Sequence, residues 1–181
     1  MKCVPLAMLL ALIAAVPASA GQAGPVTILF QAATTARDQY GGHTAGSFTM
    51  SGRFADGGNV RTSYRFAGPD VDGMATLSGA RGVFTIAMRG TLDGVVGGRQ
   101  NAGGRWRLCG GTGRYKHAAG SGLWESVADF GAAPPGLLLP EMRGAFYGLM
   151  VRGSVARRPG TLGVSCSPRT TTPHYPHVPI H

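Results

Sequence analysis

The sequence predicts an all-β protein, built as a single antiparallel β-barrel of about eight strands. Short segments alternate apolar and polar residues with a period of two, which is the pattern of strands with one buried face. Thirty of the 181 residues are glycine, and glycine is common in the tight turns between strands. Antiparallel strands joined by short turns leave edges that invite aggregation, and closure into a barrel removes those edges.

The expected elements follow one another along the chain after residue 20. The first strand covers residues 26–31, and a polar, glycine-bearing loop follows it at 34–46. Turns at 56–59 and 69–70 separate later strands, because Asp, Asn, Gly and Pro favour turns. The other strands are expected around residues 48–54, 61–66, 74–78, 84–89, 105–108, 121–128 and 142–155, with a flexible connection at 94–104.

Large apolar residues occupy one face of these strands. Eight strands enclose an interior that side chains fill or that holds one small ligand. We expect the apolar face to line a pocket for a small apolar or aromatic molecule, although some of its residues simply fill the core. The residues expected in the barrel interior are Phe48, Met50, Phe54, Tyr64, Phe66, Phe84, Ile86, Met88, Trp106 and Trp124.

Basic residues occupy the opposite face of the same strands. An outer-membrane barrel, the structural alternative, would present an outward apolar band with aromatic girdles. The basic residues therefore favour a barrel whose outer face is in water, with no membrane span. The outward positions are Arg53, Arg61, Arg65, Arg89, Arg105 and Arg107.

The first 20 residues have the pattern of a secretory signal peptide. Lys2 supplies a positive charge, residues 6–16 form an apolar core, and residues 18–20 fit the small-residue cleavage rule. A membrane anchor is the alternative, but a spanning helix needs about 20 apolar residues. We therefore expect cleavage after Ala20 and a secreted or periplasmic protein.

The mature chain is expected to hold one barrel domain over residues 21–155 and an irregular, Pro/His-rich tail over 156–181. Histidine tracts bind metal in some proteins. In this tail the spacing of His174, His177 and His181 is irregular, and no cysteine or acid lies close. We expect no metal site and no cofactor.

Two cysteines remain once cleavage removes Cys3. In an exported protein, Cys109 and Cys166 most simply form a disulfide, and two free thiols are the alternative. Loss of Lys2 lowers the formal charge from +9 to +8. A basic balance attracts anionic polymers or membrane surfaces, but these bases are scattered and also fit a GC-rich coding bias. We expect at most a weak anionic-surface contact and no specific nucleic-acid partner.

Several features invite a catalytic interpretation. The glycine-rich run at residues 110–113 matches neither phosphate-binding template, and we expect it to form a tight corner beneath a packed Tyr115. Trp124 and Glu125 face opposite sides of one strand. With Trp124 in the core, Glu125 faces solvent; an inward Glu125, the alternative, would have a raised pKa and act as an acid or base.

Two loop features receive no catalytic role. His43 and His117 are expected to be isolated loop histidines. The apolar loop at 132–140 is expected to fold over the edge of the core, and a cap on the barrel or a partner contact are the alternatives.

The stretch RWRLCGGTGRYKHAAGSGLW at residues 105–124 resembles the signature of the allene oxide cyclase-like barrels, which are similar to the dirigent proteins. The preceding GVFTIAMRGTLDG at 82–94 fits the same family order, and the similarity covers residues 48–155. The resemblance implies a barrel that holds a reactive apolar intermediate: plant members cyclise a fatty-acid epoxide, and dirigent proteins guide radical coupling. The plant cyclase uses a carboxylate near its first strand, but VTILFQA at 26–32 has none, so no catalytic residue is carried over.

Three functions remain in view. The first is a secreted, disulfide-bearing barrel that binds a small apolar or aromatic molecule without catalysis. The second is an isomerase-like, cyclase-like or coupling-guiding enzyme that uses the same pocket. The third is a barrel with a filled core that acts through its basic surface on an anionic polymer or envelope.

Overall fold

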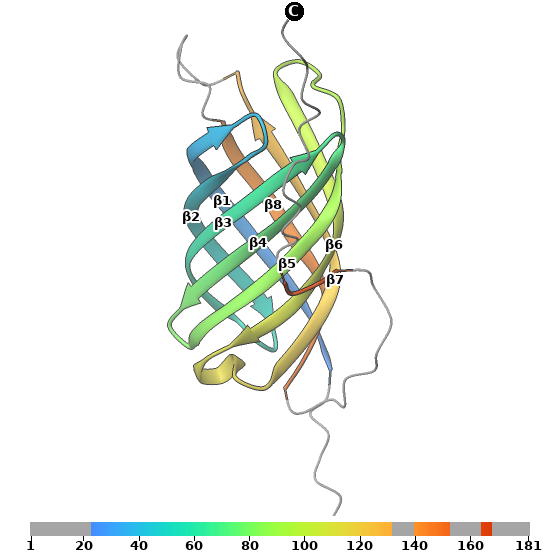
Figure 1. The fold of residues 1–181 in the computed structure, drawn as a ribbon. Helices are drawn as coiled ribbons and strands as arrows, with labels where there is room; N and C mark the ends of the chain where they lie inside the picture. Colours follow the sequence, from blue (N-terminus) through green and yellow to red (C-terminus); the bar gives the residue numbers. More distant parts are fainter. Residues whose placement is uncertain (1–22, 132–139, 153–163, 168–181) are drawn as a thin grey trace, which may run out of the picture.

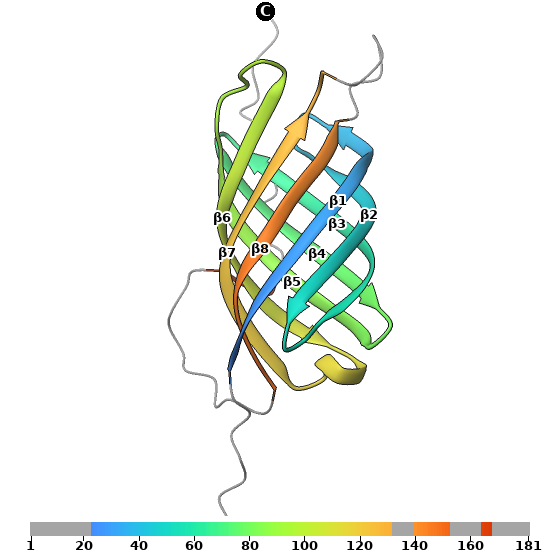
Figure 2. The ribbon, with the colours of Figure 1, turned by 180° about the vertical axis from the view of Figure 1, so that it is seen from behind.

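Eight antiparallel strands close into one barrel in the computed structural model, which describes residues 23–131, 140–152 and 164–167. Each strand pairs with its neighbours in sequence, and β8 pairs with β1 to complete the ring (Figure 1, Figure 2). The predicted fold class is therefore confirmed. The strands are β1 (Gly24–Asp38), β2 (Gly41–Gly52), β3 (Asp56–Ala67), β4 (Asp70–Gly79), β5 (Gly82–Leu92), β6 (Arg99–Gly111), β7 (Ala118–Asp129) and β8 (Glu141–Arg152).

The connections between strands alternate between the two ends of the barrel. The β1–β2, β3–β4, β5–β6 and β7–β8 connections meet at one end, which we call the mouth and which lies at the top of Figure 1. The other connections meet at the opposite end, which we call the closed end. The two ends differ in how their interior is filled.

The closed end is filled by a short 3-10 helix, η1 (Gly113–Tyr115), that connects β6 and β7. Tyr115 is fully buried there, and its ring centroid lies 4.5 Å from that of Phe84. The Tyr115 hydroxyl donates a hydrogen bond of 2.7 Å to the Asp56 carboxylate at the start of β3. Gly113 has a φ of +55°, which favours glycine. The glycine-rich run thus forms a tight corner against a packed Tyr115, as predicted.

The strands are longer than the sequence pattern predicts. The loop expected at 34–46 is wrong, because β1 and β2 stay paired to their ends at Asp38 and Gly41. Their polar side chains are satisfied inside the barrel: the Thr34 hydroxyl donates to the Pro140 carbonyl at 2.8 Å, and Thr44 shares a 2.6 Å bond with Thr62. Buried polar groups with partners cost little, so the strands continue through them.

Three further boundaries differ from the prediction. Residues 56–59 belong to β3 rather than to a turn, and the chain reverses at 53–55, where Phe54 is buried at the closed end. The connection expected at 94–104 is shorter, because β6 begins at Arg99. His43 lies in β2 and not in a loop, whereas His117 does lie in a turn. In each case continued pairing around the closed sheet outweighs local glycine content.

Cys109 and Cys166 form a disulfide, with Cα atoms 5.4 Å apart. This distance is within the usual range for such bonds. The bond attaches residues 164–167 to β6, so the predicted pairing is confirmed. The segment predicted to be a signal peptide, most of the tail and most of the 132–140 loop lie outside the described residues. Within the described part of the chain, no helix is long and apolar enough to cross a membrane.

Candidate functional site

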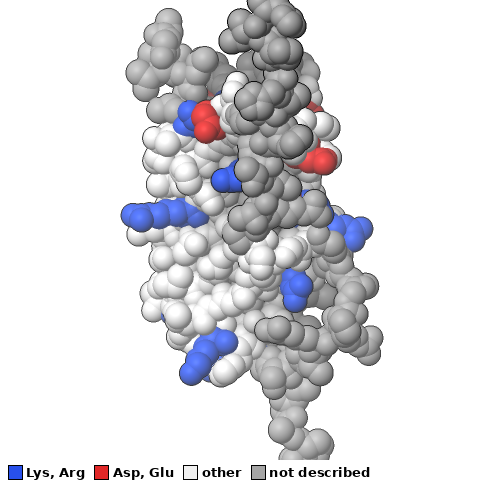
Figure 3. Space-filling model, viewed as in Figure 1, with Lys and Arg blue, Asp and Glu red and all other residues white. Residues whose placement is uncertain are grey.

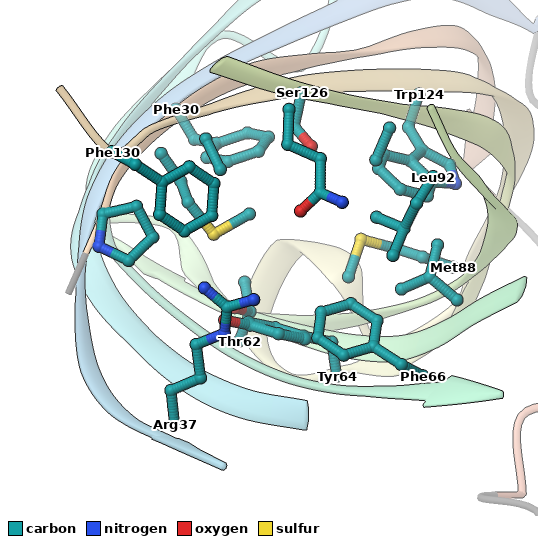
Figure 4. Close-up of a pocket in the computed structure, with 16 residues that line it drawn as sticks. Phe30, Arg37, Thr62, Tyr64, Phe66, Met88, Leu92, Trp124, Ser126 and Phe130 are labelled. Carbon is teal, nitrogen blue, oxygen red and sulfur yellow. The ribbon is translucent and has the colours of Figure 1, made fainter. Parts of the chain in front are cut away.

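An apolar cavity opens at the mouth of the barrel (Figure 4). The cavity volume is about 50 Å³, which is space for several waters or for part of a small ligand. Its walls come from seven of the eight strands, all except β2, and from residues that flank the β7–β8 connection. The lining residues are Phe30, Arg37, Thr62, Tyr64, Phe66, Val71, Met88, Leu92, Gln100, Ala102, Trp124, Ser126, Ala128, Phe130, Pro140 and Met142.

Large side chains around the cavity are fixed by specific contacts. The Trp124 indole donates a 3.2 Å hydrogen bond to the Arg89 carbonyl on β5. Phe30 packs against Phe146 at a centroid distance of 5.4 Å. Phe30 fits there because Gly144 has no side chain: a Cβ on Gly144 would lie 2.6 Å from the Phe30 ring. These walls are therefore largely pre-formed, as in most ligand pockets.

All ten residues predicted to face the interior do face it, but they divide between the two halves. Tyr64, Phe66, Met88 and Trp124 line the cavity. The others pack in the closed half: Phe48, Met50, Phe54, Phe84, Ile86 and Trp106.

Trp106 shows how the closed half is filled. It is fully buried, and its indole N–H donates to the Tyr147 carbonyl at 3.0 Å. It occupies the space beside two glycines, because a Cβ on Gly148 or Gly120 would lie 2.8 or 3.3 Å from its ring. The closed half thus has no room for a ligand at this position.

Hydroxyl groups supply most of the polarity of the cavity. Tyr64 is buried, and burial raises the pKa of its hydroxyl, although the Arg37 guanidinium and a hydrogen bond with Thr34 offset part of that rise. Tyr64 therefore stays protonated at neutral pH. Thr62 and Ser126 are also buried on opposite walls (Figure 4). These groups can donate or accept hydrogen bonds, but none is a base at neutral pH.

Arg37 reaches the cavity because β1 contains a bulge. The β1–β2 register shifts between Thr34 and Ala36, so Arg37 pairs with Gly42. Directly paired residues share a face, and the Gly42 face is interior, since a Cβ there would lie 2.7 Å from the Tyr64 hydroxyl. Bulges at barrel rims commonly re-aim a side chain in this way. Without the extra residue, Arg37 would face outward.

Two aromatic rings hold the Arg37 guanidinium at the mouth. Its central carbon lies 5.9 Å from the Phe66 ring centroid and 5.1 Å from that of Phe130. Cation–π contacts at these distances orient the group. Figure 4 shows the guanidinium directed from the rim toward the middle of the cavity. None of the ion pairs among the described residues involves Arg37.

None of the acids among the described residues lines the cavity. Glu125 is exposed on the outer face of β7 and accepts a 2.9 Å hydrogen bond from the Tyr147 hydroxyl, so the inward alternative is wrong. Asp56 lies at the closed end with Tyr115. Within residues 23–131, 140–152 and 164–167, no group of three or more His, Cys, Asp or Glu is placed to hold a metal ion. The tail histidines lie outside these residues.

The outer face carries the arginines that alternation predicts. Five of the six expected residues are exposed, and Arg89 is half-buried in an ion pair with Asp72 at 3.2 Å. Figure 3 shows basic side chains that are spread over one face rather than gathered. This spacing is typical of a solvated surface.

The sequence pattern misses several cavity residues. It assigns Arg37 to a loop and Gln100 to a connection, and it gives Phe30 and Phe130 no role. Two signals were present: Phe30 alternates with Ile28 in the first strand, and Phe130 follows Trp124, Ser126 and Ala128 at a spacing of two. Nothing in the sequence marks Arg37, because the bulge that turns it inward has no local signature.

Comparisons of the chain with protein-family models, with curated protein sequences and with solved structures found no match in any of the three. The resemblance of residues 48–155 to the allene oxide cyclase-like barrels therefore stays a prediction from the sequence.

Proposed function

We propose that the protein binds a small apolar or aromatic molecule in the mouth cavity and does so without catalysis. The single observation that carries this proposal is the division of the interior, in which one half is filled and the other keeps an apolar space open to solvent. Ligand sites are usually concave, mostly apolar and supplied with a few polar groups. Met88 and Met142 border the space, and unbranched methionines adapt to different ligand shapes.

The chemistry of the lining supports binding more than catalysis. No carboxylate, histidine or cysteine is among the lining residues that the structure describes. Tyr64 is the only weak acid there, and its raised pKa keeps the proton on the hydroxyl. Proton abstraction needs a base poised near the working pH, and the described lining residues supply none.

We further propose that the protein acts outside the cytoplasm. The disulfide between Cys109 and Cys166 supports this location, because such bonds persist in oxidising compartments. The intact mass of the protein secreted by its own host tests the location. A chain that begins at Gly21 with one disulfide is expected, and a retained leader would contradict it.

The binding proposal is tested with N-phenyl-1-naphthylamine, an uncharged dye that fluoresces in apolar surroundings. The wild-type protein is expected to bind it saturably at one site. Ala102→Phe places a ring in the cavity and is expected to weaken binding by about tenfold or more. Ala33→Phe adds the same ring on the exposed outer face of β1 and serves as the matched control.

Circular dichroism and thermal unfolding confirm that both variants fold. Equal dye affinity in the two variants, or no saturable binding by the wild type, would contradict the proposed function.

A further inference from the structure

We propose that the ligand of the mouth cavity is a compact aromatic or apolar anion, bound with its ring in the cavity and its charged group on the Arg37 guanidinium. This inference rests on the proposed function and names the class of ligand.

The charge of the cavity comes from one side chain. Among the described lining residues, Arg37 is the only one with a formal charge. The nearby acids are engaged elsewhere: Asp38 accepts a hydrogen bond from the Tyr40 N–H at 2.7 Å, and Asp129 pairs with Arg99 at 3.2 Å. The Arg37 charge therefore has aromatic neighbours and no described carboxylate to neutralise it.

The guanidinium is held in a position that suits an anion at the rim. It is exposed, so a ligand reaches it without displacing a buried partner. Phe66 and Phe130 fix it from two sides. A guanidinium presents a planar fork of donors that matches a carboxylate or a similar oxyanion in a bidentate manner.

The rest of the cavity limits the size and polarity of the body that carries the charged group. The apolar walls include Phe30, Leu92 and Trp124. The uncharged polar side chains of the lining are Thr62, Tyr64, Gln100 and Ser126. The cavity volume of about 50 Å³ favours a compact ligand, held in part by the cavity, over a long chain. Apolar walls also lower the local dielectric constant, which strengthens the attraction between the two charges.

A pair of probes with the same rings tests the inference. 2-Naphthoate carries a carboxylate, and 2-naphthamide has an uncharged amide in its place. Displacement of N-phenyl-1-naphthylamine measures both affinities. The wild-type protein is expected to bind 2-naphthoate roughly tenfold more tightly, since hydrogen bonds to charged groups are the stronger ones. Added salt is expected to reduce that preference, because Arg37 is exposed.

Variants then assign the preference to Arg37. Arg37→Gln is expected to bind the two probes equally, with each probe affinity referred to the variant's own affinity for the dye. Arg37→Lys keeps the charge without the planar fork and is expected to retain part of the preference. Arg61→Gln removes an exposed outer-face arginine of β3 and is the matched control, with wild-type behaviour expected.

The outcomes separate this inference from the proposed function. If the wild-type protein binds 2-naphthamide as tightly as 2-naphthoate, or if Arg37→Gln keeps the preference, the anion inference is overturned while ligand binding stands. If neither the dye nor either probe binds, both proposals fail.

Discussion

The closed end and the mouth of the barrel contain similar aromatic residues but differ in what lies opposite them. At the closed end, Trp106 fills the space beside Gly120 and Gly148. At the mouth, Trp124 faces a space bordered by small side chains, among them Ala102 and Ala128. Side chains just fill the interior of an eight-stranded barrel. The barrel is therefore hollow where small residues have no large side chain opposite them.

The largest expected difference between the two ends is in the effect of a Trp→Ala substitution on the free energy of unfolding. Trp106→Ala removes a fully buried ring and is expected to lower the free energy of unfolding by about 4 kcal/mol. Trp124→Ala enlarges an existing, solvent-connected space, so its cost is expected to be smaller, about 2 kcal/mol. Denaturant unfolding measures both.

The dye gives these two variants an independent readout. Trp124→Ala is expected to change the affinity for N-phenyl-1-naphthylamine, whereas Trp106→Ala at low temperature is expected to leave it near the wild-type value. Equal destabilisation by the two substitutions would show that the mouth is packed as tightly as the closed end.

The fold was predictable because alternation survives in most strands. Residues such as Phe84, Ile86 and Met88 show which face of a strand is buried. Closure into a barrel is then expected, because it removes unpaired strand edges. The division of the interior was not predictable in the same way. Trp106 and Trp124 have the same periodic context, and each pairs with a glycine across the β6–β7 ladder. Only the packing in three dimensions separates them, because the Trp106 ring lies against Gly120 and Gly148 whereas Trp124 lines the cavity.

Bulges account for another part of what the sequence could not show. One extra residue turns every later side chain of a strand to the opposite face. The bulge in β1 brings Arg37 inward. In β6, Cys109 is the extra residue, because Ile86 pairs with Leu108 and Thr85 pairs with Gly110. Simple alternation therefore does not predict the direction of Arg37, which places a positive charge at the mouth, or of Cys109, which forms the disulfide.

A second comparison tests the hydrogen bond that ties η1 to the closed end. Tyr115→Phe removes the hydroxyl that donates to Asp56 and is expected to lower the free energy of unfolding by about 1–2 kcal/mol, since the acceptor is charged and part-buried. Tyr147→Phe removes a similar bond to Glu125 on the exposed outer face. Its stability is expected to equal that of the wild type within error.

Thermal and denaturant unfolding of both variants give the answer. If Tyr115→Phe is as stable as Tyr147→Phe, the bond to Asp56 does not hold the closed end together, and packing of the ring alone is sufficient.

The smallest expected effect is the pH dependence that Asp56 gives to the closed end. Burial alone would raise the pKa of Asp56, but hydrogen bonds from the Tyr115 hydroxyl and from backbone N–H groups outweigh burial and lower it. A folded-state pKa below the unfolded value means that the folded state favours the ionised carboxylate. This contribution to stability is fully present above the unfolded pKa, near pH 4, and is lost as the pH falls through the folded pKa.

Unfolding free energies measured between pH 7 and pH 2 separate Asp56 from the other acids. Asp56→Asn is expected to show a shallower fall below about pH 4 than the wild type, because the linked proton uptake is removed. Asp70→Asn, at an exposed position at the start of β4, is expected to follow the wild-type curve. Parallel curves for Asp56→Asn and the wild type would mean that protonation of this carboxylate is not linked to unfolding. The acid sensitivity of the barrel would then arise at the mouth or on the outer face rather than at its closed end.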